Sequence, residues 1–116
     1  MLDEIVAEAS RSVSQFWFIR SLQEVDRTDN TVKLRLHIGS ELFVQVYASQ
    51  LSGQISFALI SHGQRLFGRN CHGGFWHRHP FDAPGSHDFS SEGSRAVSLT
   101  EFLIEVEDLL MQHNLL

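Results

Sequence analysis

The fold is decided by the stretch VKLRLHIGSELFVQV, residues 32–46. On both sides of Gly39-Ser40, aliphatic residues at every second position alternate with polar or aromatic ones. Because successive side chains of a strand point to opposite faces of a sheet, this pattern predicts two strands with one buried face. The short turn between them predicts a hairpin, so the two strands run antiparallel.

The same period of two continues on both sides of this hairpin. It predicts a first strand over residues 16–25, a fourth over residues 55–60 and a fifth that opens at Leu66-Phe67. Polar turn sequences separate these strands. Strands joined in order by short turns form a meander, so we expect a five-stranded antiparallel sheet.

The two ends of the chain have helical periodicity instead. Apolar residues recur at helical spacing between Leu2 and Val13, which predicts an amphipathic helix over about residues 2–15. Ser98 followed by Glu101 is a capping box, which predicts the start of a C-terminal helix. The sequence therefore predicts one α+β domain, residues 1–116: N-terminal helix, five-stranded antiparallel β-meander, long His-rich loop and C-terminal helix, with both helices on one face of the sheet.

Composition narrows the class of protein. A chain of 116 residues with 42% hydrophobic and 20% charged residues is typical of a single globular domain. No apolar run approaches the roughly 20 residues that a membrane span needs, so we expect no membrane association. The acidic N-terminal residues and the single cysteine, Cys71, are typical of a cytoplasmic protein.

The charge of the chain is unevenly distributed. The formal net charge of −5 argues against broad, non-specific binding of nucleic acid. Eight of the nine basic residues are arginine, the better residue for bidentate contacts with phosphate. Arg65, Arg69 and Arg78 lie in or beside residues 67–87, which favours either a locally basic site or three solvated side chains.

Histidines are concentrated between residues 67 and 87. This segment contains four of the seven histidines, namely His72, His77, His79 and His87. Histidine titrates near neutrality, so a cluster of histidines is typical of metal ligands or proton shuttles. His77 and His79 are separated by one residue, and in extended chain both imidazoles point the same way. From Cys71 to Val97 no periodicity is visible, and long loops of this kind are usually functional or disordered.

One interpretation of the cluster is a metal site. His77 and His79 supply a His-x-His pair, and His72, His87 or Asp82 supplies a third ligand. Such a site would hold zinc or another divalent transition metal.

A second interpretation needs no cofactor. Cleavage of RNA by attack of its 2′-hydroxyl group needs a base, an acid and a cation near the phosphate. His77, His79 and His87 supply the base and the acid, and Arg69 or Arg78 supplies the cation. Phe75 and Trp76 would stack on splayed bases. The third interpretation is a histidine-aromatic loop that only packs on the edge of the sheet.

The order of these features resembles the TumE family, the proposed toxins of small bacterial and archaeal toxin–antitoxin pairs. The likeness covers the layout of the whole chain, and its motifs lie at Arg69-Asn70, at His79-Pro80 and from Pro84 to His87. It implies a helix-turn-helix antitoxin as partner and RNA as the target. Apolar residues also lie outside the buried stripe of the C-terminal helix or beyond it: Ile104, Met111, Leu115 and Leu116. They favour either a partner, as an antitoxin or a second copy of the chain, or a helix that the sheet and the first helix bury on both sides.

Overall fold

The computed structural model describes all 116 residues, and it confirms an α+β meander flanked by two helices. The six strands form one antiparallel sheet in the order of the chain, from β1 to β6. The sheet has one strand more than the sequence predicted. The elements are α1 (Leu2–Gln15), β1 (Ser21–Arg27), β2 (Thr31–His37), β3 (Leu42–Ser49), β4 (Ile55–Ser61), β5 (Gln64–His72), β6 (Phe75–His79) and α2 (Leu99–Gln112).

The sixth strand arises from a glycine pair inside the segment that was predicted to be a loop. Gly73 and Gly74 both have positive φ angles, of 60° and 82°. Two residues of this conformation make the tight turn that matches the twist of a hairpin. The turn pairs β5 with β6, and the ladder runs from His72–Phe75 to Gly68–His79. The Gly-Gly pair was the signal for this strand in the sequence.

The first strand also starts later than predicted, at Ser21 instead of residue 16. Phe18 and Ile19 are both buried, although they are neighbours in the chain. In a strand, one of the two would point away from the core. Residues 16–20 instead form a turn, in which the Ile19 N–H donates to the Phe16 carbonyl.

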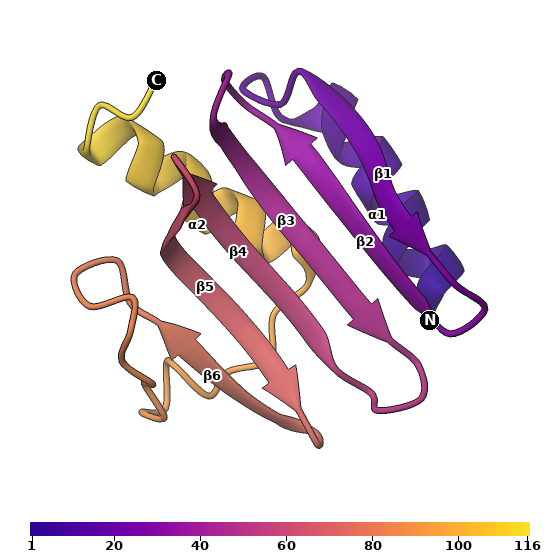
Figure 1. Cartoon of the computed structure of the whole chain (residues 1–116). Coiled ribbons are helices and arrows are strands. Elements are labelled where there is room, and N and C mark those ends of the chain that lie inside the picture. The colour runs from indigo at the N-terminus through magenta and orange to yellow at the C-terminus, as the bar shows by residue number, and fades with distance from the viewer.

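Both helices cover the same face of the sheet, as the sequence predicted (Figure 1). α1 lies against β1, β2 and β3, and α2 lies against β4. The ring of Phe102 from α2 packs on Phe57 and Phe67, with centroid separations of 5.5 and 5.4 Å. We call this side of the sheet the helix face. Neither helix is long and apolar enough to cross a membrane.

Two sets of hydrogen bonds stabilise the N-terminus of α2. Ser98 and Glu101 form the predicted capping box, in which each side chain accepts a backbone N–H of the other residue. The carboxylate of Glu8 in α1 accepts the N–H and the hydroxyl group of Thr100, at 2.9 and 2.8 Å. A carboxylate at a helix N-terminus is favoured by the helix dipole, so this contact ties the two helices together.

Arg69 ties α2 and residue 92 to the helix face. Its side chain has no exposed surface. Nε and Nη2 donate to both carboxylate oxygens of Glu105, at 2.8 and 2.7 Å. Nη1 and Nη2 donate to the carbonyl and the carboxylate of Glu92, at 2.8 and 3.0 Å. The buried guanidinium group is therefore compensated by charged hydrogen bonds to two segments that are distant from Arg69 in sequence.

The other side of the sheet, which we call the open face, carries the alternate side chains of the strands. In Figure 1 both helices pass behind the sheet, so no helix covers the open face. Neighbouring positions across the central strands pair in register, as in the row Lys33–Tyr47–Ser56–Asn70–His77. The open-face positions used below are Lys33, Arg35, Phe43, Tyr47, Ser56, Arg65, Gly68, Asn70, Phe75, His77 and His79.

We predict that Arg69→Met lowers the free energy of unfolding by about 2–3 kcal/mol. Removing one partner of a buried ion pair costs roughly 3–5 kcal/mol, and the partial exposure of Glu92 and Glu105 reduces that cost. Urea unfolding measures the change. The control is Arg95→Met. Arg95 is 41% exposed, hydrogen-bonds to Glu92 and forms a longer ion pair with Glu105, so its loss costs below about 1 kcal/mol. Equal losses in the two variants would contradict the role of Arg69.

Candidate functional site: a three-histidine cluster

β6 turns His77 and His79 to the open face. His77 pairs with Asn70 and His79 pairs with Gly68, whereas Arg78 pairs with Arg69 on the helix face. The two histidines stand at alternate positions of one strand, as the sequence predicted for extended chain. Their Nε2 atoms lie 3.1 Å apart.

His87 reaches the same point through a second chain segment beside β6. Arg78 and Asp88 exchange both backbone hydrogen bonds, with N–O distances of 3.1 and 2.8 Å. In this antiparallel arrangement the neighbours of Asp88 lie on the open face, His87 beside His79 and Phe89 beside His77. The ring centroids of His79 and His87 are 4.8 Å apart, and those of His77 and Phe89 are 5.3 Å apart.

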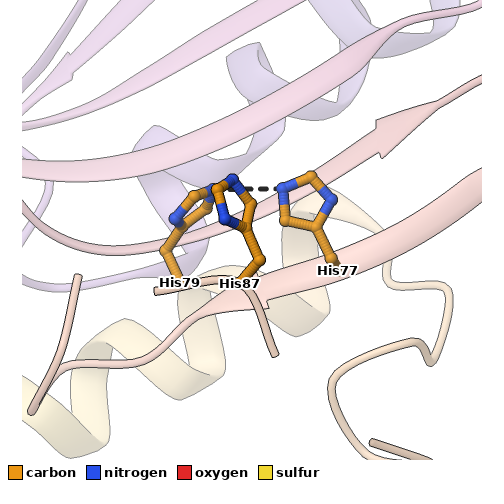
Figure 2. Close-up of side chains that lie close together, drawn as sticks. All are labelled: His77, His79 and His87. Carbon is orange, nitrogen blue, oxygen red and sulfur yellow. Dashed lines mark hydrogen bonds between the residues drawn. The ribbon is translucent and has the colours of Figure 1, made fainter. Parts of the chain in front are cut away.

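The three imidazoles converge on one point (Figure 2). One ring nitrogen from each of His77, His79 and His87 lies within 4.8 Å of the other two. His79 is almost completely buried, His77 is half-buried and His87 is exposed. The cluster is therefore buried at His79 and accessible to solvent at His87.

Hydrogen bonds define the tautomer of His79. Its Nδ1 lies 2.9 Å from the carbonyl oxygen of Pro84. A carbonyl oxygen only accepts, so Nδ1 carries the hydrogen and Nε2 of the neutral ring presents a lone pair. The amide of Asn70 lies 3.4 Å from that lone pair, and its oxygen accepts the hydroxyl group of Ser56. His79 Nε2 thus accepts the hydrogen of His77 Nε2, and a proton or a metal ion would take the place of that hydrogen bond.

The environment favours the neutral forms of His77 and His79. Burial lowers the pKa of His77, and the positive charges of His87, Arg65 and His72 lower it further. Burial is also the largest cause of the lowered pKa of His79, followed by the charge of Arg65, while the Pro84 carbonyl opposes it. Neutral imidazole is the form that accepts a proton or binds a metal.

Arg65 is the cation of this site, and a β-bulge places it there. β5 has one extra residue between the pairs Leu59–Phe67 and Ile60–Arg65. Regular alternation from Phe67 would turn Arg65 to the helix face, but the bulge turns it to the open face. Its Nη2 donates to the Pro84 carbonyl at 3.3 Å, the same oxygen that binds His79.

Gly68 leaves the space for this approach. A Cβ atom at residue 68 would lie 3.3 Å from the Cδ atom of Arg65 and 3.1 Å from the Phe57 carbonyl oxygen. The same atom would lie 3.8 Å from the Cβ atom of His79. The glycine therefore lets the arginine stem cross β5 beside the histidine.

The structure does not bring the two other predicted arginines to the histidines. Arg69 is buried on the helix face, and it cannot contact a phosphate at the cluster. Arg78 lies on the same face, where its guanidinium group is paired with the carboxylate of Asp88. Both residues support the site from behind. Arg69 and Arg78 are close to His77 and His79 in the chain, which is why they were predicted at the site, but strand alternation places them on the opposite face.

The remaining predicted residues also divide between the two faces. His72 is exposed at the end of β5 and does not belong to the three-histidine group, and Asp82 is outside it as well. Trp76 packs on Phe57 on the helix face, with ring centroids 6.2 Å apart. Phe75 remains exposed beside the cluster, and Phe89 joins it as an aromatic residue that the sequence did not single out.

The donor set fits a transition metal. Three neutral imidazoles suit zinc, and the hydrogen bond from His79 Nδ1 to a backbone carbonyl is the usual support of a ligating histidine. His77, His79 and His87 would hold the ion, and the exposed side of His87 would leave a coordination position for water or substrate. His72 is not needed as a ligand.

The cluster lies on the surface and not in an enclosed pocket. None of the surface hollows of the structure is lined by His77, His79 or His87. Small-molecule sites are typically concave and bury most of their ligand. A surface cluster with exposed aromatic neighbours is better suited to a macromolecule.

No protein-family model matches the chain, and no curated protein and no solved structure matches it either.

We predict that acidification destabilises the protein between about pH 7.5 and 5.5, above the range where carboxylates titrate. The lowered pKa values of His77 and His79 mean that the unfolded chain binds more protons there, so stability falls as pH falls. Urea unfolding across this range measures the slope. His77→Gln/His79→Gln should flatten it, and an unchanged slope would contradict the lowered pKa values of His77 and His79.

Proposed function

We propose that the protein is the toxin component of a toxin–antitoxin pair and cleaves RNA at His77, His79 and His87. The observation that carries this proposal is the convergence of three histidines around the fixed lone pair of His79, with Arg65 beside it. These are the groups that cleavage by a 2′-hydroxyl group needs, namely a base, an acid and a cation. The resemblance to TumE proteins supplies the biological context.

In the metal-free form of this reaction, His79 is the base. Its Nε2 takes the proton of the 2′-hydroxyl group, and the oxygen attacks the adjacent phosphorus. The bond to the 5′-oxygen breaks, and that oxygen takes a proton from protonated His87. The products are a 2′,3′-cyclic phosphate and a 5′-hydroxyl end. Arg65 faces the charge that develops on the phosphate, the role first assigned to Arg69 or Arg78.

The second candidate is a metal-binding function at the same histidines, with zinc or another divalent transition metal. The specific observation in its favour is the mutual approach of three ring nitrogens within 4.8 Å. Bound zinc would supply a water molecule of lowered pKa. The metal site would serve either hydrolysis or a non-enzymatic interaction domain.

As a toxin of this kind, the protein would lie in the cytoplasm and bind a helix-turn-helix antitoxin. Ile104 and Met111 are 54% and 63% exposed and stand seven residues apart, on one side of α2. Exposed apolar residues on one side of a helix suit either an antitoxin or a second copy of the chain. Co-purification with the product of the neighbouring reading frame tests this partner.

We predict that His79→Ala abolishes growth arrest on controlled expression and RNA cleavage by the purified protein, because it removes the base. Loss of one general base typically costs about 10²–10⁴ in rate. His62→Ala is the matched control, since His62 lies in the β4–β5 turn and pairs with Glu41. Arrest and cleavage at the control level in His79→Ala would refute the catalytic assignment.

For the metal candidate, we predict one zinc ion per chain in protein purified without a histidine tag. Elemental analysis after zinc loading and dialysis should show its loss in His79→Ala and its retention in His62→Ala. A metal-free wild-type protein would exclude this candidate. Chelation separates the two forms of the ribonuclease: cleavage that survives it is metal-free, and cleavage that zinc restores depends on the ion.

A further inference from the structure

We infer that the open face of the sheet is a binding track for single-stranded RNA that leads to the histidine cluster. This inference rests on the proposed function and names the form of its substrate. The track runs from Lys33 and Arg35 on β2, across Tyr47 on β3, to Arg65 and the histidines at the other edge.

The sheet separates the basic residues of the open face from the acidic residues of the two helices. Lys33, Arg35 and Arg65 have no carboxylate within salt-bridge distance, although the protein carries 14 acidic residues. Seven of those acidic residues lie on α1 and α2, behind the sheet. Asp26, which pairs with Lys33 in the ladder, is the acidic residue at the far corner of the track. The open face is therefore locally basic on a protein of net charge −5.

Arg35 has an unmet hydrogen-bonding capacity. Its Nε atom is buried and has no hydrogen-bond partner. Its guanidinium carbon lies 4.5 Å from the centroid of the Phe43 ring, which holds the group in place over the sheet. A buried donor without a partner costs free energy. An anionic ligand on the open face would be attracted to the guanidinium group of Arg35.

Aromatic side chains stand between the charges. Tyr47 pairs with Lys33 and with Ser56 in the central row of the open face. Phe75 and Phe89 are 78% and 64% exposed beside His77. A basic surface interleaved with aromatic rings is the pattern that binds single strands, because the rings stack on unpaired bases.

The dimensions suit a short single strand. Strands lie about 4.8 Å apart, so β2 and β6 are separated by about 19 Å. Single-strand binding surfaces of this kind cover about four or more nucleotides. A duplex has its bases already stacked, so it cannot use the aromatic side chains of the face.

Fluorescence anisotropy with a labelled 2′-O-methyl oligouridine tests the track, because this probe cannot be cleaved by its own 2′-oxygen. Lys33→Ala/Arg35→Ala should weaken binding about fivefold or more and lower the salt slope by about 1.4. The control is Arg11→Ala/Arg20→Ala, which changes the charge equally and removes arginines without a salt bridge from α1 and from the turn before β1. Tyr47→Leu should weaken binding without changing the salt slope.

Four outcomes would overturn the track. They are the absence of binding, equal effects of the two double variants, equal affinity for a duplex of the same chemistry, and a dimer in light scattering that dissociates on Arg35→Ala. The last outcome would assign the face to a second copy of the chain. Binding without cleavage of unmodified RNA refutes the ribonuclease and leaves the track intact. Cleavage that is indifferent to Lys33 and Arg35 refutes the track alone.

Discussion

The alternation of side chains across β4, β5 and β6 is the constraint on which the site depends. It sends Phe57, Phe67 and Arg69 toward the helices, and it sends Asn70 and His77 to the opposite side. Because the sheet is only one layer thick, the two sets are separated by the backbone alone. The helix face supplies the packing that keeps the strands in register, and the open face uses that register to align its polar side chains. A slip of one residue in β6 would bury His77 and His79 against α2 and turn Arg78 outward.

This constraint also explains what the sequence could and could not predict. Alternation within residues 32–46 was sufficient for the hairpin, and the capping box was sufficient for the start of α2. His77 and His79 were predicted to converge because they belong to one strand. His87 was only one of several candidates, since its place depends on the backbone pairing of Arg78 with Asp88 across nine intervening residues. Pairing between distant segments leaves little trace in local periodicity.

The arginines show most clearly what the local sequence pattern could not predict. Arg65, Arg69 and Arg78 all lie near the histidines in sequence, yet only Arg65 lies near them on the open face. A single inserted residue in β5 decides this, because it reverses the alternation between Phe67 and Arg65. Bulges follow from pairing between strands, so composition does not reveal them. Gly68 was a usable signal, because glycine inside a strand often marks a close approach of another group.

The Pro84 carbonyl oxygen positions both His79 and Arg65. It accepts from His79 and from Arg65, and so it holds the His79 imidazole in one tautomer and the Arg65 guanidinium group beside it. The rings of His77, His79 and His87 are about equally close to one another, with centroid separations of 4.8 to 5.0 Å. In-line displacement at phosphorus places the attacking and leaving oxygens on opposite sides. A metal-free reaction therefore requires His87, on its separate segment, to reach across the phosphate. A metal ion would instead draw all three nitrogens together, so the position that His87 takes when a phosphate binds distinguishes the two chemistries.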